Sequence, residues 1–167
     1  GLLTTVSEVD GAIPVHQVPR ELLERQAASL QLPLHTVALP VAASNAVYEA
    51  RLAAALAGLA PRRIAFGDLF LADLRTYREE LFSRLGWETC FPLWRRDTTA
   101  LAHEFLALGF RARVVAGLLA GRPFDADFLA ALPAGVDPCG ENGEFHTFVY
   151  DGPGFAWPVP TDLLPQS

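Results

Sequence analysis

Three clusters of polar residues contain side-chain types that can activate or bind a small ligand. The first is Ser44-Asn45 with Tyr48-Glu49, the second is Gly67-Asp68 with Asp73, Arg75, Tyr77, Arg78 and Glu79, and the third runs from Cys139 to Thr147. Each cluster follows a segment with strand character. In open α/β sheets, ligands collect at the carboxyl ends of strands, so these positions are the first candidates for a site.

Asp68 is the strongest single candidate in the second cluster. Gly67 allows a ligand to approach the main chain closely, and the carboxylate of Asp68 could bind magnesium or a ribose hydroxyl. A structural alternative stays open. In that alternative, Asp68 caps the following helix, while Arg75, Arg78 and Glu79 form a solvated face with pairing between residues four apart.

The third cluster combines two glycines with acidic, amide and imidazole side chains. It consists of Cys139, Gly140, Glu141, Asn142, Gly143, Glu144, His146 and Thr147. Glycines interleaved with acids can wrap around a small polar ligand, and histidine titrates near neutral pH, so Glu141, Glu144 and His146 are candidate catalytic groups. Alternatively, Glu144 and His146 are strand residues that face solvent beside inward Phe145 and Phe148.

Other reaction classes have little support in this sequence. His16, His35, His103, His146, Cys90 and Cys139 show no spacing typical of metal ligands, so no metal site is predicted from them. The two cysteines form no CxxC pair and are expected to be free thiols. A serine hydrolase is disfavoured because no GxSxG elbow is present.

The composition favours one globular α/β domain spanning residues 1–167. About half of the residues are hydrophobic (51%), which is enough to build a core, and the net charge of -6 disfavours a nucleic-acid partner. No apolar run is long enough for a membrane span, so a cytoplasmic protein without a membrane partner is expected. The absence of methionine indicates that residues precede Gly1.

Strand and helix patterns alternate along the chain. Strands are expected at 2–6, 34–39, 63–66, 89–91, 112–115 and 144–150. Helices are expected around 21–30, from Ser44 or Asn45 to 59, before Gly86, from Asp97 or Thr98 to 108, and near 125–132. The alternation predicts a Rossmann-like parallel sheet with helices on both faces. The Pro- and Gly-rich end is expected to be irregular.

Three motifs together resemble the diphthine-ammonia ligase family of PP-loop ATP pyrophosphatases, in particular its bacterial branch. They are the segment from Gly67-Asp68-Leu69-Phe70-Leu71 to Glu79, Phe91-Pro92-Leu93-Trp94, and Asp137 to Thr147. The resemblance implies an adenine nucleotide alpha hydrolase-like fold. It also implies that ATP and Mg²⁺ activate a carboxylate acceptor by adenylation, and that ammonia, or a donor of ammonia, then displaces AMP to form an amide.

The resemblance also assigns roles to residues. Ser44, Asn45, Gly67 and Asp68 would lie near nucleotide or substrate, whereas Glu141, Asn142, Glu144 and His146 would line the acceptor pocket, in a substrate-loop region at about 133–151. The family's phosphate-binding PP-loop and the central strand before it would lie upstream of Gly1. His146 stands where diphthamide-forming members carry an acidic residue, so a different acceptor is expected. Residues 115–121 are shorter than the family's connection.

Two other hypotheses remain for the function. A non-catalytic module of the same fold, which binds an adenine nucleotide or another small ligand, is favoured by the missing PP-loop. A structural subunit of a homo-oligomer is suggested by the exposed sheet edges that a missing central strand would leave. Turnover of ATP would exclude the binding module.

Overall fold

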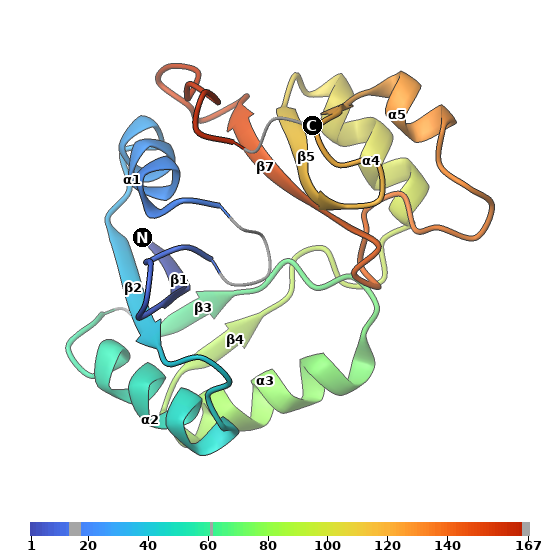
Figure 1. The fold of residues 1–167 in the computed structure, drawn as a ribbon. Helices are drawn as coiled ribbons and strands as arrows, with labels where there is room; N and C mark the ends of the chain where they lie inside the picture. Colours follow the sequence, from blue (N-terminus) through green and yellow to red (C-terminus); the bar gives the residue numbers. More distant parts are fainter. Residues whose placement is uncertain (14–17, 61, 165–167) are drawn as a thin grey trace.

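A computed structural model describes residues 1–13, 18–60 and 62–164 of the chain (Figure 1). The strands of these residues are β1 (Leu2–Ser7), β2 (Leu34–Leu39), β3 (Arg63–Ala65), β4 (Glu88–Cys90), β5 (Arg111–Gly117), β6 (Pro123–Phe124) and β7 (Phe145–Asp151). Their helices are α1 (Arg20–Ser29), α2 (Asn45–Leu56), α3 (Ala72–Arg84), α4 (Thr98–Ala107) and α5 (Ala126–Ala130). Apart from β6, each of these elements lies where the sequence predicts it, within a few residues.

The strands form two parallel pairs and one antiparallel sheet. β1 pairs with β2, and β3 pairs with β4, with α1 and α3 as the respective crossover helices. Parallel neighbours need such a crossover, so the βαβ interpretation is confirmed for both pairs. The third sheet has the order β6-β5-β7, and both of its pairings are antiparallel.

The described residues form small parallel and antiparallel sheets and not one continuous Rossmann-like sheet. The reason in the C-terminal part is the connection after β5, where a turn over residues 118–122 is too short for a crossover and forces β6 to return antiparallel. Gly121 donates its N–H to the carbonyl of Val114 (2.8 Å), which closes this turn. In the N-terminal part, α2 leads from β2 to β3, yet these strands belong to separate two-stranded sheets.

Three apolar clusters form the core. One joins α2 and α3 to both parallel pairs, through Leu52, Leu56, Leu81 and Phe82. A second joins α1 to β1, β5 and β7. The third lies under the antiparallel sheet, where Phe128 and Phe145 pack in an aromatic group with ring centroids 5.0 Å apart. Phe145 and Phe148 belong to different clusters, so β7 buries side chains on both of its faces.

Helix ends follow the local sequence rules. The side chains of Ser44, Asp97 and Asp125 accept hydrogen bonds from main-chain N–H groups in the first turns of α2, α4 and α5. Gly86 and Gly109 follow α3 and α4 with positive φ values, which glycine adopts without strain. Residues 152–164 contain no helix or strand, as expected for the Pro- and Gly-rich end. Within the described segments, no helix is long and apolar enough to cross a membrane.

Candidate functional site

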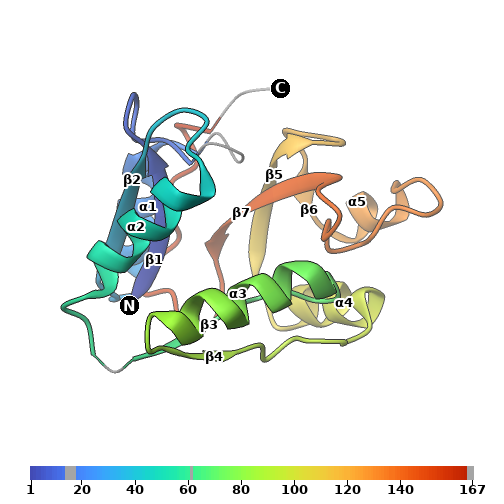
Figure 2. The ribbon, with the colours of Figure 1, turned by 90° about the horizontal axis from the view of Figure 1, so that it is seen from below.

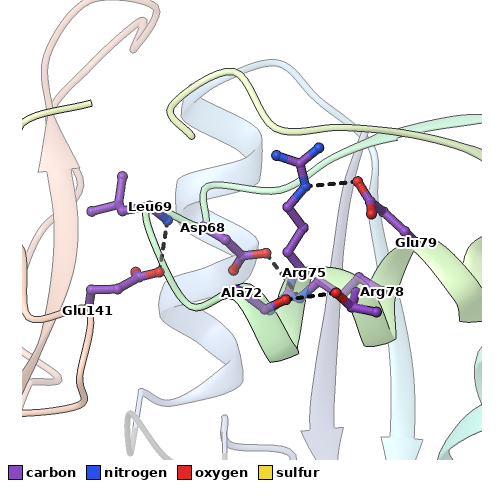
Figure 3. Close-up of polar contacts among 8 residues, drawn as sticks. Asp68, Leu69, Ala72, Arg75, Arg78, Glu79 and Glu141 are labelled. Atoms are coloured by element: carbon purple, nitrogen blue, oxygen red, sulfur yellow. Dashed lines mark hydrogen bonds and ion pairs between the residues drawn. The ribbon is translucent and has the colours of Figure 1, made fainter. Parts of the chain in front are cut away.

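The loop between β3 and α3 places a carboxylate in the interior. Asp68 is 8% exposed, and its Oδ2 atom lies 3.2 Å from Nε of Arg78, one and a half turns into α3 (Figure 3). The guanidinium of Arg78 in turn stacks on the ring of Phe66, 4.3 Å from the centroid. Asp68 does not cap α3, because the N-cap position is Leu71 and no side chain caps this helix. The capping alternative is therefore wrong.

The charge of Asp68 is only partly compensated. Burial raises the pKa of this carboxyl above its usual value, Arg78 opposes the rise, and the nearby charge of Glu141 adds to it. Although Arg78 is close enough for an ion pair, the geometry gives Oδ2 no hydrogen bond among the described residues. A buried oxygen without a donor is costly, so it is a natural acceptor for a ligand N–H or O–H.

Glu141 links this loop to the C-terminal part of the chain. Its Oε1 atom accepts a hydrogen bond of 2.8 Å from the main-chain N–H of Leu69, across 72 positions of sequence (Figure 3). The carbonyl of Leu69 accepts from the N–H of Arg95, also at 2.8 Å. Both the N–H and the carbonyl of Leu69, the residue directly after Asp68, are thus held by hydrogen bonds. The second and third predicted clusters meet here.

The loop that carries Glu141 is organised by two other carboxylates. Oδ2 of Asp137 accepts from the N–H of Glu141 (2.8 Å). The carboxylate of Glu144 accepts from the N–H of Asp137 (3.1 Å), and from the N–H (3.1 Å) and Nδ2 (3.0 Å) of Asn142. Burial opposes ionisation of Glu144, but these donors outweigh it and lower its pKa. The hydrogen bonds that Glu144 accepts therefore stabilise the conformation of this loop.

Two further residues of the loop have structural constraints. Gly140 has a φ of 69°, and a Cβ atom there would lie 2.7 Å from the carbonyl oxygen of Phe145. Cys139 donates from Sγ to the carbonyl of Thr98 at 3.3 Å. Burial, followed by the charges of Asp137 and Glu141, raises the pKa of the Cys139 thiol to about 11. This thiol is a poor nucleophile at neutral pH, because the thiolate is the reactive form.

His146 and Thr147 lie on β7 beside β5, where they pair with Ala116 and Val114. His146 is half-buried and Thr147 is exposed. The register shifts between Val114 and Ala116, which is a β-bulge next to this histidine. The catalytic role of His146 stays a prediction.

The α3 residues of the second cluster make contacts of two kinds. The guanidinium of Arg75 lies over the rings of Phe91 and Trp94, 4.7 Å from each centroid, and its Nε donates to Glu79 at 2.8 Å. The predicted pairing four residues apart is thus confirmed for this pair. Arg75 joins two of the three family-like motifs. Asp73 is exposed in the first turn of α3.

The first cluster lies at the start of α2, where Tyr48 lines a cavity together with Arg78. Ser44 caps α2 with its hydroxyl 3.4 Å from the N–H of Val47, and Asn45 is exposed at the start of the helix. The link from α2 to α3 is made by Glu49, which accepts from the hydroxyl of Tyr77 (3.3 Å) and from Arg84 (2.8 Å). Ser44 and Asn45 remain binding candidates by position only.

A pocket that the sequence reasoning missed lies at the carboxyl ends of β1 and β2. Its volume is about 620 Å³, and its lining comprises Ser7, Asp10, Ala12, Ile13, Leu39, Pro40, Val41, Ala42 and Ala43. The same strand-end rule that selected Asp68 could have found Ser7 and Asp10. Asp10 accepts from the N–H of Ala12 at 3.1 Å, and this bond chiefly lowers the pKa of its carboxyl.

The described residues do not by themselves fit ATP or a metal ion. The three segments that lead from β1, β2 and β3 to the following helices contain only Gly11 and Gly67, so none is a glycine-rich phosphate loop. In residues 1–13, 18–60 and 62–164, no three His, Cys, Asp or Glu side chains gather as metal ligands. His16 lies outside these segments. Asp68 and Glu141 could at most supplement oxygens of a bound substrate around Mg²⁺.

Comparison with known proteins identifies the C-terminal part of the chain. Residues 97–160, which span α4, β5, β6, α5 and β7, match the family model described as "Diphthamide synthase C-terminal domain". A search of curated proteins gave no match. Asp137, Glu141, Glu144 and His146 all lie inside the matched segment, whereas Asp68 lies outside it. Residues 97–160 are therefore related to the C-terminal domain of diphthamide synthase, and this unit supplies the Glu141 side of the site.

Proposed function

We propose that the chain carries the acceptor-binding part of an ATP-dependent carbon–nitrogen ligase that converts a carboxylate into an amide with ammonia. In such a reaction ATP activates the carboxylate with release of pyrophosphate, and ammonia then displaces AMP. The relation of residues 97–160 to the diphthamide synthase C-terminal domain supports this reaction class. The observation that carries the proposal is the hydrogen bond from Leu69 to Glu141, which brings that unit to Asp68.

Asp68 is proposed to bind the nitrogen donor through a hydrogen bond to its carboxylate. Its Oδ2 atom is buried and lacks a hydrogen bond among the described residues, so it can accept one from an N–H of ammonia or ammonium. The raised pKa leaves this carboxyl closer to neutral pH than an ordinary aspartate, which suits a group that takes up a proton as the amide forms. The reaction also requires a phosphate-binding loop, which the segments after β1, β2 and β3 do not supply.

The test, in a protein that joins these residues to a phosphate-binding loop, is formation of AMP and pyrophosphate from ATP and Mg²⁺, with ammonium and a panel of free carboxylic acids as probes. We expect equal amounts of both products, dependent on ammonium. Asp68→Asn should lower the rate by about a hundredfold or more, as loss of a general base or acid does. The matched control is Asp127→Asn, which makes the same change at an exposed position of α5 and should leave the rate unchanged.

A second candidate is a non-catalytic module that binds an adenine nucleotide or another small ligand. It is favoured by the lack of a glycine-rich loop after β1, β2 and β3, together with the strand-end pocket of about 620 Å³. This candidate predicts saturable binding of AMP, measured by calorimetry, without production of pyrophosphate from ATP. Measurable turnover of ATP to AMP would exclude it.

A further inference from the structure

An arginine of α3 holds the buried carboxylate of the candidate site. The helix lies alongside the β3–β4 pair in both views of the ribbon, so Arg78, in the middle of α3, can reach the loop that follows β3 (Figures 1 and 2). The side chains of Arg78 and Asp68 are 28% and 10% exposed (Figure 3). The other ion pair that α3 makes with a distant residue, Arg84 with Glu49, has an arginine that is 56% exposed. Charges attract more strongly where water is excluded, so the pair with Asp68 has the larger influence on its partner.

An aromatic ring fixes the plane of the Arg78 guanidinium. The centroid of the Phe66 ring lies 4.3 Å from Cζ of Arg78. This ring is itself held by two others, because it meets Phe82 edge-on at 5.2 Å and stacks on Phe91 at 5.5 Å. A guanidinium over an aromatic face gains a cation–π contact and keeps a defined orientation, which the ammonium of a lysine does not. Arg78 is therefore fixed both by Phe66 and by its ion pair with Asp68.

The groups that surround Asp68 act on its ionisation in opposite directions. Burial raises the pKa of this carboxyl, Arg78 opposes the rise, and the charge of Glu141, from the loop before β7, adds to it. Arg78 also acts on the half-buried Tyr48 of α2, where burial raises the pKa of the phenol and Arg78 opposes that rise as well. Without the charge of Arg78, burial and Glu141 would together favour the neutral form of Asp68.

The ion pair balances the charge of Asp68 without occupying its acceptor. Oδ2 lies 3.2 Å from Nε of Arg78, but among the described residues no group donates a hydrogen bond to this oxygen. A lone pair of Oδ2 therefore remains available to another donor, while the negative charge is partly compensated. This combination suits a carboxylate that has to stay ionised in the interior and still accept a proton.

We propose that Arg78 is a positioning residue, which keeps the Asp68 carboxylate ionised and in one orientation to accept a proton from the nitrogen donor. The inference rests on the proposed function of Asp68. As the C–N bond of the amide forms, the C–O bond to AMP breaks and AMP leaves with its electron pair, while the nitrogen loses a proton to Asp68. The guanidinium of Arg78 stays protonated and exchanges no proton itself.

The first experiment follows the carboxyl carbon of Asp68 by carbon-13 NMR during a pH titration without ATP. Asp68→Asn identifies the signal by its loss. In Arg78→Met the midpoint should move to higher pH by about one unit or more, because a nearby positive charge favours the ionised carboxyl. Arg84→Met makes the same change at the exposed pair with Glu49 and should leave the midpoint as in the wild-type protein. An unchanged midpoint in Arg78→Met would overturn the proposal.

The pH profile of amide formation, in a protein that includes a phosphate-binding loop, separates charge from orientation. In Arg78→Met the rate should fall at least tenfold at neutral pH and recover as the pH rises and Asp68 ionises. In Arg78→Lys, which keeps the charge without the stacked plane, the rate should fall at every pH while the midpoint of Asp68 stays close to that of the wild-type protein. An equal loss at every pH in Arg78→Met would indicate a merely structural role and would overturn the proposal.

Two features of this design keep the outcomes distinct. Arg78→Gln is a second neutral variant, with the same expected shift, if Arg78→Met does not fold. The titration needs no ATP, so a shifted midpoint without any turnover of ATP would support the effect of Arg78 on Asp68 and overturn the proposed reaction. Turnover of ATP with an unshifted midpoint would do the reverse.

Discussion

At the scale of single residues, the site depends on where each carboxylate is held. Asp68 is buried beside Arg78 with one oxygen that lacks a hydrogen bond, whereas the oxygens of Glu144 are occupied by donors of its own loop. Burial raises the pKa of Asp68, and hydrogen bonds lower that of Glu144. Perturbed groups of the first kind are typical of functional sites, because burial and neighbouring charges are arranged there to shift pKa values.

The reactivity of the Cys139 thiol tests whether this side chain is buried. Because burial raises its pKa to about 11, the fraction of thiolate at pH 8 should be about a hundredfold lower than for a thiol with the ordinary pKa of 9.0. Alkylation of Cys139 by iodoacetamide, followed by mass spectrometry of its peptide, should be correspondingly slow. The same cysteine in protein unfolded by urea is the control. Equal rates in the two states would show that this thiol is not buried.

The raised pKa of Cys139 also has a consequence for stability. The folded state keeps its proton to higher pH than the unfolded state does, so the unfolded state binds fewer protons between these pKa values. The contribution of this thiol to stability is therefore complete below pH 9 and is lost as the pH rises from about 9 to about 11.

The sequence predicts individual site residues better than their partners. Asp68 follows from the rule that polar groups at strand ends mark sites, and the pairing of Arg75 with Glu79 follows from helical spacing. The bond between Glu141 and Leu69 could not be predicted, because no local pattern connects positions 72 residues apart. The structural role of Glu144 could not be distinguished from catalysis, because an acidic residue in a glycine-containing loop is compatible with both.

At the scale of elements, the loop from Asp137 to Glu144 has a defined shape set by its glycines and its internal acceptors. Gly140 and Gly143 both have positive φ values, at 69° and 82°. A Cβ atom at Gly140 would approach the carbonyl oxygen of Phe145 to 2.7 Å, whereas a Cβ atom at Gly143 would have no neighbour within 4 Å. The two positions therefore separate the cost of the backbone conformation from the cost of a clash.

We expect Gly143→Ala to lower the free energy of unfolding by about 1–2 kcal/mol, which is the cost of the left-handed conformation for a residue with a Cβ atom. Gly140→Ala should lower it further, because the carbonyl of Phe145 belongs to β7 and cannot move without disturbing the sheet. Urea denaturation of both variants measures the difference. Equal losses would mean that β7 can shift, and would contradict the close packing described for this loop.

Helices and strands could be predicted where local sequence rules determine them, but the pairing of the strands into sheets could not. Ser44 and Asp97 mark helix starts, and Gly86 and Gly109 mark helix ends, because caps depend only on nearby main-chain groups. β6 was missed because it has two residues, of which one is Pro123. The assembly of strands into three small sheets depends on contacts between distant segments, which periodicity does not encode.

At the scale of the whole molecule, the site lies where two parts of the chain meet. The parallel pairs supply the loop with Asp68, and the unit related to the diphthamide synthase C-terminal domain supplies Glu141. The N–H of Leu69 joins these parts near the site through its hydrogen bond to the carboxylate of Glu141. The geometry of Asp68 therefore depends on a residue that belongs to the other part.

The most direct test of this account is hydrogen exchange at the amide of Leu69, in the wild-type protein and in Glu141→Ala. A hydrogen bond to a charged acceptor contributes about 1.5–3 kcal/mol, so exchange at Leu69 should be about ten to a hundred times faster in the variant. Glu24→Ala, which removes an exposed carboxylate of α1, is the control and should leave Leu69 unchanged. Rapid exchange at Leu69 in the wild-type protein, or equal exchange in Glu141→Ala, would contradict a single site built by both parts of the chain.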